Sequence, residues 1–183
     1  MGRVSQAQAR ENRRRVVDTA ARLFRERGVQ QVSVADLMAE AGLTHGGFYK
    51  RFASKEALVT EAVGQAFAER AAELDELAAR EDHASARRDF VTAYLSPEHR
   101  DNPGTGCPAV AFGADVARED AGGGAREPYA DGIERYARWL AGDGGEDLAA
   151  VSTLVGALML ARATSGTPLS DRILTAARES LAH

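Results

Sequence analysis

Apolar residues recur every three to four positions along most of this chain, a spacing that places them on one face of successive helices. The pattern predicts helices over about 11–27, 34–41, 55–80, 84–95, 107–120, 128–140, 146–164 and 168–181. Abundant Ala, Leu, Arg and Glu, with few β-branched runs, favours the same class of structure. We therefore expect an all-α protein.

The stretch from residue 33 to residue 58 carries the clearest local signals. Ser33 stands three residues before Asp36, the spacing of a reciprocal cap at a helix start. Gly42 supplies a residue that can adopt a positive φ and end this first helix. Ser54 is the expected N-cap of a later helix, with Glu56 in its first turn. The stretch therefore predicts a helix, a tight turn, a second short helix and the capped start of a third.

The second short helix combines an apolar side with an unusual outer side. Phe48 and Phe52 lie four residues apart and face inward, while Thr44 can cap the helix start. The outward residues supply hydrogen-bond donors, positive charge and little bulk: His45, Gly46, Gly47, Tyr49, Lys50 and Arg51. Two glycines cost about 1 kcal/mol each inside a helix, and close approach of the backbone to DNA is one reason to omit side chains there. A short, poorly formed surface helix is the alternative.

These residues resemble the N-terminal helix-turn-helix of TetR-type transcriptional regulators. The family pattern is matched by Ser33, Leu37, Ala41, Gly42, Thr44, Gly46, Phe48, Tyr49, Phe52, Ser54, Lys55, Glu56 and Leu58. The resemblance covers roughly the first third of the chain. Gly47 departs from the pattern, since the family often has a small side chain there that can touch a base.

The resemblance implies a DNA-binding head over residues 1–55 and a larger helical body for ligand binding and dimerisation over residues 56–183. By the same resemblance, the protein is a homodimeric transcriptional regulator, with repression favoured, that a small-molecule inducer releases from a palindromic operator. The expected partners are therefore double-stranded operator DNA, an unknown inducer and a second copy of the chain.

The resemblance also implies specific roles for residues in and beside the second short helix. Thr44, Tyr49 and Lys55 are expected to contact phosphates, Lys55 because it lies at a helix start where free N–H groups also bind anions. His45, Lys50 and Arg51 are the expected base or backbone readers, with the backbone of Gly46 and Gly47 beside them. A solvated surface role is the alternative for His45 and Lys55.

The charge distribution supports a DNA-binding head. The chain has a net charge of −4, but residues 1–55 carry eleven Lys or Arg and five Asp or Glu, which leaves −10 for the rest. A basic head on an acidic body directs phosphate to one end of the molecule. Residues 1 to about 9 form an expected polar arm, in which Arg3 either reaches the DNA or stays solvated.

The body offers two further predictions. By the resemblance, the residues expected around a ligand cavity are Phe67, Phe90, Tyr94, Phe112, Tyr136 and Trp139, although each of them suits an ordinary core equally well. The helices over 146–164 and 168–181 either pair with those of a second chain in a four-helix interface or close the core of a monomer.

Cys107 precedes Pro108 at a predicted helix start, so its thiol would feel the positive end of the helix dipole. It is therefore added to the expected pocket as a candidate redox or electrophile sensor, the alternative being a small buried hydrophobe. A sensor using Cys107 and a non-DNA-binding interaction protein are the competing functions. The sequence has no Walker loop, nucleophile elbow or Cys-His signature, so we expect no enzyme, no cofactor and no metal. It also lacks a membrane-spanning run, which favours a cytoplasmic location.

Overall fold

The computed structural model describes residues 6–80, 82–120 and 123–182, and within these ranges the chain consists of α-helices, short 3₁₀ turns and loops, without a β-strand. The all-α prediction is confirmed. The α-helices are α1 (Gln6–Arg27), α2 (Val34–Glu40), α3 (Lys55–Ala78), α4 (His83–Tyr94), α5 (Pro97–Asp101), α6 (Pro108–Ala117), α7 (Arg126–Ala141), α8 (Leu148–Ala163) and α9 (Pro168–Ser180). The 3₁₀ turns are η1 (Val29–Gln31), η2 (His45–Gly47), η3 (Pro103–Thr105) and η4 (Gly142–Gly144).

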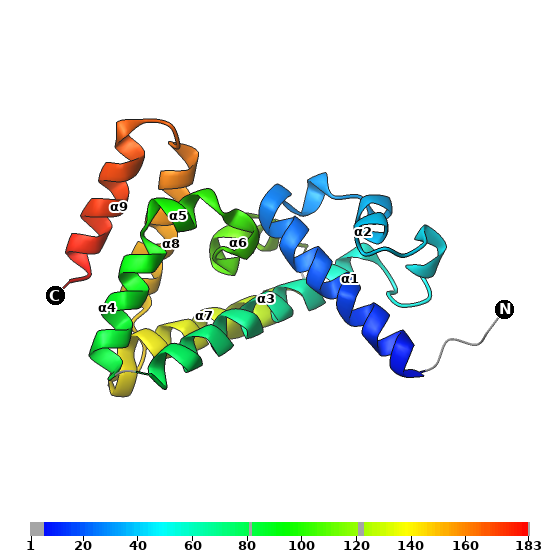
Figure 1. The fold of residues 1–183 in the computed structure, drawn as a ribbon, viewed down its shortest axis with the longest axis horizontal. Coiled ribbons are helices and arrows are strands. Elements are labelled where there is room, and N and C mark those ends of the chain that lie inside the picture. Colours follow the sequence, from blue (N-terminus) through cyan, green and yellow to red (C-terminus); the bar gives the residue numbers. More distant parts are fainter. Residues whose placement is uncertain (1–5, 81, 121–122, 183) are drawn as a thin grey trace.

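The helices form an elongated molecule with a separate group of helices at each end (Figure 1). Helices α1 and α2 and the turn after α2 gather at one end, which we call the head. Helix α3 leaves the head and runs beside α7, while α8 and α9 lie side by side at the opposite end. Helix α6 lies between the head and the rest of the helices, which we call the body.

The buried apolar residues form one continuous cluster that crosses from the head into the body. It includes Phe24 and Phe48 in the head, Leu58 in the first turn of α3, Phe112 on α6 and Leu158 on α8. Because α3 packs on α1 at one end and on α7 at the other, head and body share one core. The division between residues 55 and 56 therefore falls at the start of the helix that joins the two parts, and it stays a prediction.

Two local predictions need correction. Helix α1 begins at Gln6, so residues 6–9 are helical and are not part of a loose arm, while Arg3 lies outside the described residues. No helix was predicted between those over 84–95 and 107–120, yet this segment contains α5. The Ser96 hydroxyl accepts a hydrogen bond of 3.1 Å from the His99 N–H, and Pro97 occupies the first helical position, which suits proline.

Candidate nucleic-acid interface and cavity of the body

Helix α2 is fixed at both ends by its own sequence. The Ser33 hydroxyl accepts from the Asp36 N–H at 3.1 Å, and the Asp36 carboxylate accepts from the Ser33 N–H at 3.3 Å, so the predicted capping box is present. These hydrogen bonds lower the pKa of Asp36. At the other end Gly42 has a φ of 68°, and the N–H of Leu43 donates to the carbonyl of Met38 at 2.8 Å. This is the hydrogen-bond pattern of a glycine-terminated helix, and it sets the direction of the following segment.

The segment after Leu43 is less regular than predicted. His45–Gly47 forms the 3₁₀ turn η2, and the N–H groups of Arg51 and Phe52 then donate to the carbonyl of Phe48 at 2.8 Å and 3.0 Å. The second short helix that was expected here is thus reduced to a 3₁₀ turn and one further turn, which is closer to the alternative of a short, poorly formed helix. Two adjacent glycines disfavour a helix of this length. The Thr44 hydroxyl makes no capping hydrogen bond, and its side chain stays exposed.

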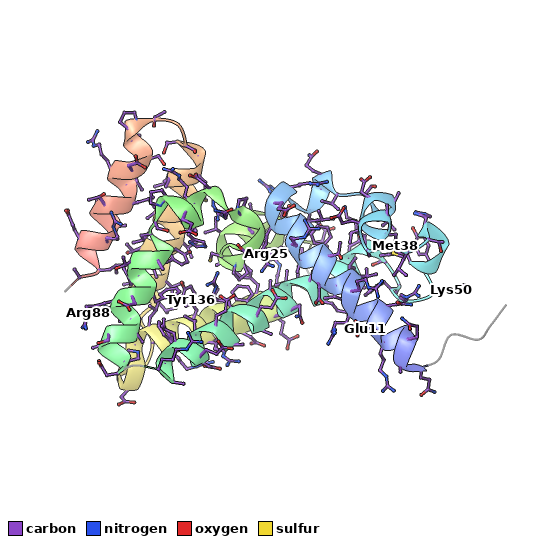
Figure 2. The ribbon with its side chains drawn as sticks, viewed as in Figure 1. Glu11, Arg25, Met38, Lys50, Arg88 and Tyr136 are labelled. Atoms are coloured by element: carbon purple, nitrogen blue, oxygen red, sulfur yellow. The ribbon has the colours of Figure 1, made fainter. Side chains whose placement is uncertain are left out.

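The segment nevertheless has the predicted inner and outer sides. Phe48 and Phe52 are buried, with their ring centroids 5.4 Å apart. On the other side Tyr49 is 67% exposed, and His45 and Lys50 are also exposed. Lys50 lies at the end of the head farthest from the body (Figure 2). We call Thr44, His45, Gly46, Tyr49 and Lys50, together with the half-buried Gly47, the reading surface.

Gly46 and Gly47 leave the middle of the reading surface without side chains. A Cβ atom on Gly46 would have no neighbour within 4 Å, and one on Gly47 would meet the terminal nitrogen of Arg51 at 2.6 Å. Neither glycine has a positive φ. The backbone conformation therefore does not require glycine at Gly46, and its effect is to let another molecule come close to the main chain.

Two of the predicted DNA contacts, Arg51 and Lys55, make hydrogen bonds within the protein. The Arg51 guanidinium donates to the carbonyl of Gly47 at 2.6 Å. The Lys55 ammonium donates to the carbonyl of Val29 at 2.7 Å and lies 6.0 Å from the centre of the Phe24 ring. An ammonium has three donors, so this bond leaves Lys55 able to bind a phosphate as well.

Arg13 on α1 holds the end of the segment after Leu43 against α1 and α3, a role that no local sequence pattern predicts. Its guanidinium donates to the carbonyl of Arg51 and to the carboxylate of Glu61 on α3, and it lies 4.4 Å from the centre of the Phe52 ring. On the same helix Arg10, Arg14 and Arg15 are exposed. The head therefore has a positive surface on α1 in addition to its reading surface.

The residues expected around a ligand cavity are mostly buried. Phe67, Phe90, Tyr94, Cys107, Phe112 and Tyr136 are at most 7% exposed, and Trp139 is partly buried. The ring of Phe90 lies 5.5 Å from that of Tyr94, 5.6 Å from that of Tyr136 and 5.3 Å from that of Trp139. Phe67 instead packs edge to face against Tyr129 at 5.4 Å. The predicted set is thus split between at least two places in the core.

A cavity of about 740 Å³ opens between α3, α4, α5 and η3. Of the predicted residues, Phe90 and Tyr94 line it. Arg70 and His99 also line it, although no local sequence pattern marks either residue. Figure 2 shows Tyr136 inside the body beside the helices that enclose this region.

His99 connects the cavity to the start of α6. Its Nδ1 lies 2.7 Å from the carbonyl oxygen of Tyr94, and its Nε2 lies 3.1 Å from the backbone nitrogen of Cys107. Since a carbonyl only accepts and a backbone N–H only donates, Nδ1 carries the proton and Nε2 accepts. Burial lowers the pKa of His99 to about 4, so the ring is neutral near pH 7.

Cys107 is the N-cap of α6, as predicted, but its side chain makes no capping hydrogen bond and the residue is 1% exposed. A buried thiol is poorly accessible to oxidants and electrophiles. Its position fits the alternative of a small buried hydrophobe better than that of a sensor.

Comparison with known families agrees with the geometry of the head. Residues 16–62 match the model for the family described as bacterial regulatory proteins, tetR family. The chain is similar to the HTH-type transcriptional regulator AcrR of Shigella flexneri, with 36% identity over 61 residues, which is 33% of this chain and 28% of that protein. It is also similar to the uncharacterized HTH-type transcriptional regulator YerO of Bacillus subtilis (strain 168), with 36% identity over 52 residues, 28% of this chain and 18% of that protein. The matches thus span less than a third of these relatives.

Solved structures match over nearly the whole chain. The reduced form of E. coli NemR has a TM-score of 0.75 at 20% identity, with 93% of this chain and 95% of that chain covered. A TetR family transcriptional regulator from Cytophaga hutchinsonii has a TM-score of 0.75 at 18% identity, with 99% and 97% covered. At these identities the similarity shows the fold alone. Across the part of the chain that the structure describes, no helix combines the length and apolar character needed to cross a membrane.

Proposed function

Because this chain belongs to the TetR family of transcriptional regulators, we propose that it is a homodimeric repressor that a small-molecule inducer releases from a near-palindromic operator. The observation that carries the proposal is the reading surface. Its side chains point outward from a well-packed head, and its glycine-bearing centre leaves the backbone open to a close neighbour.

On DNA, the head would use two kinds of contact. Thr44, Tyr49 and Lys55 bind phosphates and fix the position of the head, whereas His45 and Lys50 reach base edges or the backbone. Arg51 can join the readers after its guanidinium leaves the carbonyl of Gly47. The exposed arginines of α1 add attraction for phosphate that does not depend on sequence.

Exposed apolar side chains on α8 and α9, which we call the strip, support the homodimer. Leu148 is 51% exposed, Met159 54%, Leu160 51% and Leu169 46%. Gly156 on α8 has open space in front of it, which permits close approach of another helix. Pairing of this strip with its copy would bury these side chains. The strip lies at the end of the molecule opposite the head, so a dimer would carry two heads to successive major grooves.

A chain of contacts could couple the cavity to the head. His99 lines the cavity, and its Nε2 accepts a hydrogen bond from the backbone N–H of Cys107, the N-cap residue of α6. Near the other end of α6, the carboxylate of Asp115 accepts from the N–H of Val29 at 3.2 Å, and the carbonyl of Val29 accepts from Lys55. A ligand that moves α6 would therefore change the support of Lys55 and favour a head position that no longer fits the operator.

Footprinting on the DNA upstream of the gene for this chain tests the proposal. We expect protection of two half-sites whose centres lie about 10 base pairs or a multiple apart. Absence of a protected site at low salt would contradict it. The burial of Cys107 gives no support to the thiol-sensor alternative.

A further inference from the structure

Buried hydrogen-bonding groups lie beside the cavity on the side formed by Tyr94 and Arg70, which we call its inner end. The hydroxyl of Tyr94 and the Nε of Arg70 are buried and make no hydrogen bond of good geometry among the described residues, although both residues line the cavity. The Cys107 thiol lies near the Tyr94 hydroxyl and, after burial, is a further cause of the raised pKa of Tyr94. The hydroxyl of Tyr136 is also buried without a partner, and its ring lies 6.3 Å from that of Tyr94. Burial of such groups costs free energy that a suitable ligand would recover. All three can donate a hydrogen bond, so together they favour a ligand that accepts.

The rest of the Arg70 guanidinium is held firmly. One terminal nitrogen forms an ion pair with Glu73 at 2.7 Å, and the other donates to the carbonyl of Thr105 in η3 at 3.4 Å. These bonds fix the plane of the group, so its unpartnered Nε has a defined direction. The guanidinium is thus pre-oriented for an acceptor.

The cations near the inner end are the guanidiniums of Arg70, which is paired with Glu73, and of Arg162. Arg70 and Arg162 are the charged groups that lower the pKa of His99 in addition to burial, and Arg70 also acts on Tyr94 and Tyr136. Arg162 donates to the carbonyls of His99 and Arg100 at 3.0 Å and 3.1 Å, and no carboxylate of the described residues lies within ion-pair distance of it. A negative charge at the inner end would therefore be stabilised.

Two carboxylates also line the cavity. Both Glu73 and Glu98 are exposed to solvent, and Glu73 is already paired with Arg70. Three rings, those of Phe90, Tyr94 and His99, also line the cavity. An occupant with a flat apolar part would pack on these rings.

We propose that this cavity binds a small aromatic carboxylate, with the carboxylate turned inward to the Tyr94 hydroxyl and the Arg70 guanidinium and the ring against Phe90. The inference rests on the proposed function, because it names the ligand class for the body of a ligand-controlled regulator. Entry requires the Tyr94 side chain to turn about its Cα–Cβ bond and the Arg70 side chain to shift, since the hydroxyl of Tyr94 and the Nε of Arg70 are both closed to solvent in this structure. A cavity of about 740 Å³ has room for a ligand of one or two rings.

Three probes of the same shape and different charge test the ligand class. Titration calorimetry of the full chain without DNA compares 2-naphthoate, 2-naphthamide and 2-naphthamidine at pH 7.5. We expect 2-naphthoate to bind at least about tenfold more tightly than the neutral amide, because hydrogen bonds to a charged acceptor are the stronger ones. The cationic amidine should bind no more tightly than the amide.

Tyrosine variants test the site. Tyr94→Phe should weaken binding of 2-naphthoate about tenfold and leave the melting temperature of the free protein unchanged or higher, because the hydroxyl that it removes has no partner there. The matched control is Tyr129→Phe, whose hydroxyl donates to the carbonyl of Ala109 at 2.9 Å. This control should melt at a lower temperature and bind 2-naphthoate as the unmodified chain does. Arg70→Lys, which keeps the charge and removes the Nε donor, should also weaken binding.

Several results would overturn the inference: no binding of 2-naphthoate, equal affinity for all three probes, tightest binding of the amidine, or unchanged affinity in both Tyr94→Phe and Arg70→Lys. The calorimetry contains no DNA, so these failures are separate from failure of the proposed regulator. A protein that protects an operator and binds none of the probes would remain a regulator with a different ligand.

Discussion

The ammonium of Lys55 donates to the carbonyl of Val29 at 2.7 Å, and this bond joins the first residue of α3 to the turn after α1. The N–H of the same Val29 donates to Asp115 on α6. The backbone at Val29 in the head is therefore held both by α3, through Lys55, and by α6 of the body, through Asp115. A movement of α6 can reach Lys55 through this segment.

Asp115→Ala should weaken the coupling between cavity and head more than it weakens DNA binding. The variant removes one hydrogen bond, which costs about 1 kcal/mol of unfolding free energy, while the reading surface keeps its own contacts. We expect operator affinity within a few-fold of the original and a reduced response to inducer. Anisotropy of labelled operator with and without the ligand measures both quantities. A full response would exclude this route, and Asp131→Ala at an exposed position of α7 is the control.

Gly46→Ala should separate folding from DNA binding. The added methyl group has open space, and Ala is favoured over Gly in helical structure by up to about 1 kcal/mol, so the melting temperature should stay the same or rise. Operator affinity should fall at least about tenfold, because the methyl group would occupy the space that the DNA needs. Gly144→Ala in η4, which also has no neighbour for a Cβ atom, is the control and should bind DNA normally. Unchanged affinity in Gly46→Ala would show that DNA does not approach this point.

Local signals predicted much of the head. The capping pair Ser33 and Asp36, the stop at Gly42 and the cap at Ser54 are contained within a few residues each, and all are present. Helices within irregular segments were harder to predict from the sequence. The helix signal of Ser96 and Pro97 was hidden among prolines, glycines and polar residues, and α5 was missed for that reason.

Roles that depend on distant contacts could not be predicted. Arg13 was visible only as one of several arginines, because its contacts with Arg51 and Glu61 are made by the folded chain. The same holds for His99, whose ring joins Tyr94 to Cys107 through hydrogen bonds to the backbone. Apolar spacing correctly indicated buried aromatic residues, but it did not indicate which of them line the cavity.

His99 should make the protein less stable in acid. Its pKa is about 4 in the folded chain and 6.5 as the ordinary value, so between these values the unfolded chain binds the proton and the folded chain does not. The unfolding free energy should therefore fall as pH decreases from 6.5 to 4, by at most about 3 kcal/mol, and this contribution should level off below pH 4. Urea denaturation at several pH values, compared with His99→Gln, isolates it. Identical pH dependence of the unfolding free energy in the two proteins would show that His99 is not the source of this effect.

Met159→Glu should break the proposed homodimer. Burial of an unpaired carboxylate at the centre of an apolar interface is costly, so the variant should be largely monomeric and bind the operator weakly. Sedimentation velocity gives the mass of each species. Ala72→Glu on the exposed face of α3 adds the same charge elsewhere and should leave the dimer intact. A dimeric Met159→Glu protein would place the interface on another surface.

The salt dependence of DNA binding tests the head most directly. We propose measuring operator affinity over a series of salt concentrations for the original chain and for two variants. Lys55→Gln removes the positive charge and keeps a donor for the carbonyl of Val29. Arg80→Ala removes the same charge from an exposed position at the far end of α3. The account predicts that affinity falls steeply with salt. Lys55→Gln should make the slope shallower by about 0.9 for each phosphate that the protein no longer binds, while Arg80→Ala should leave the slope unchanged. Salt-independent binding, or equal slopes in all three proteins, would contradict it.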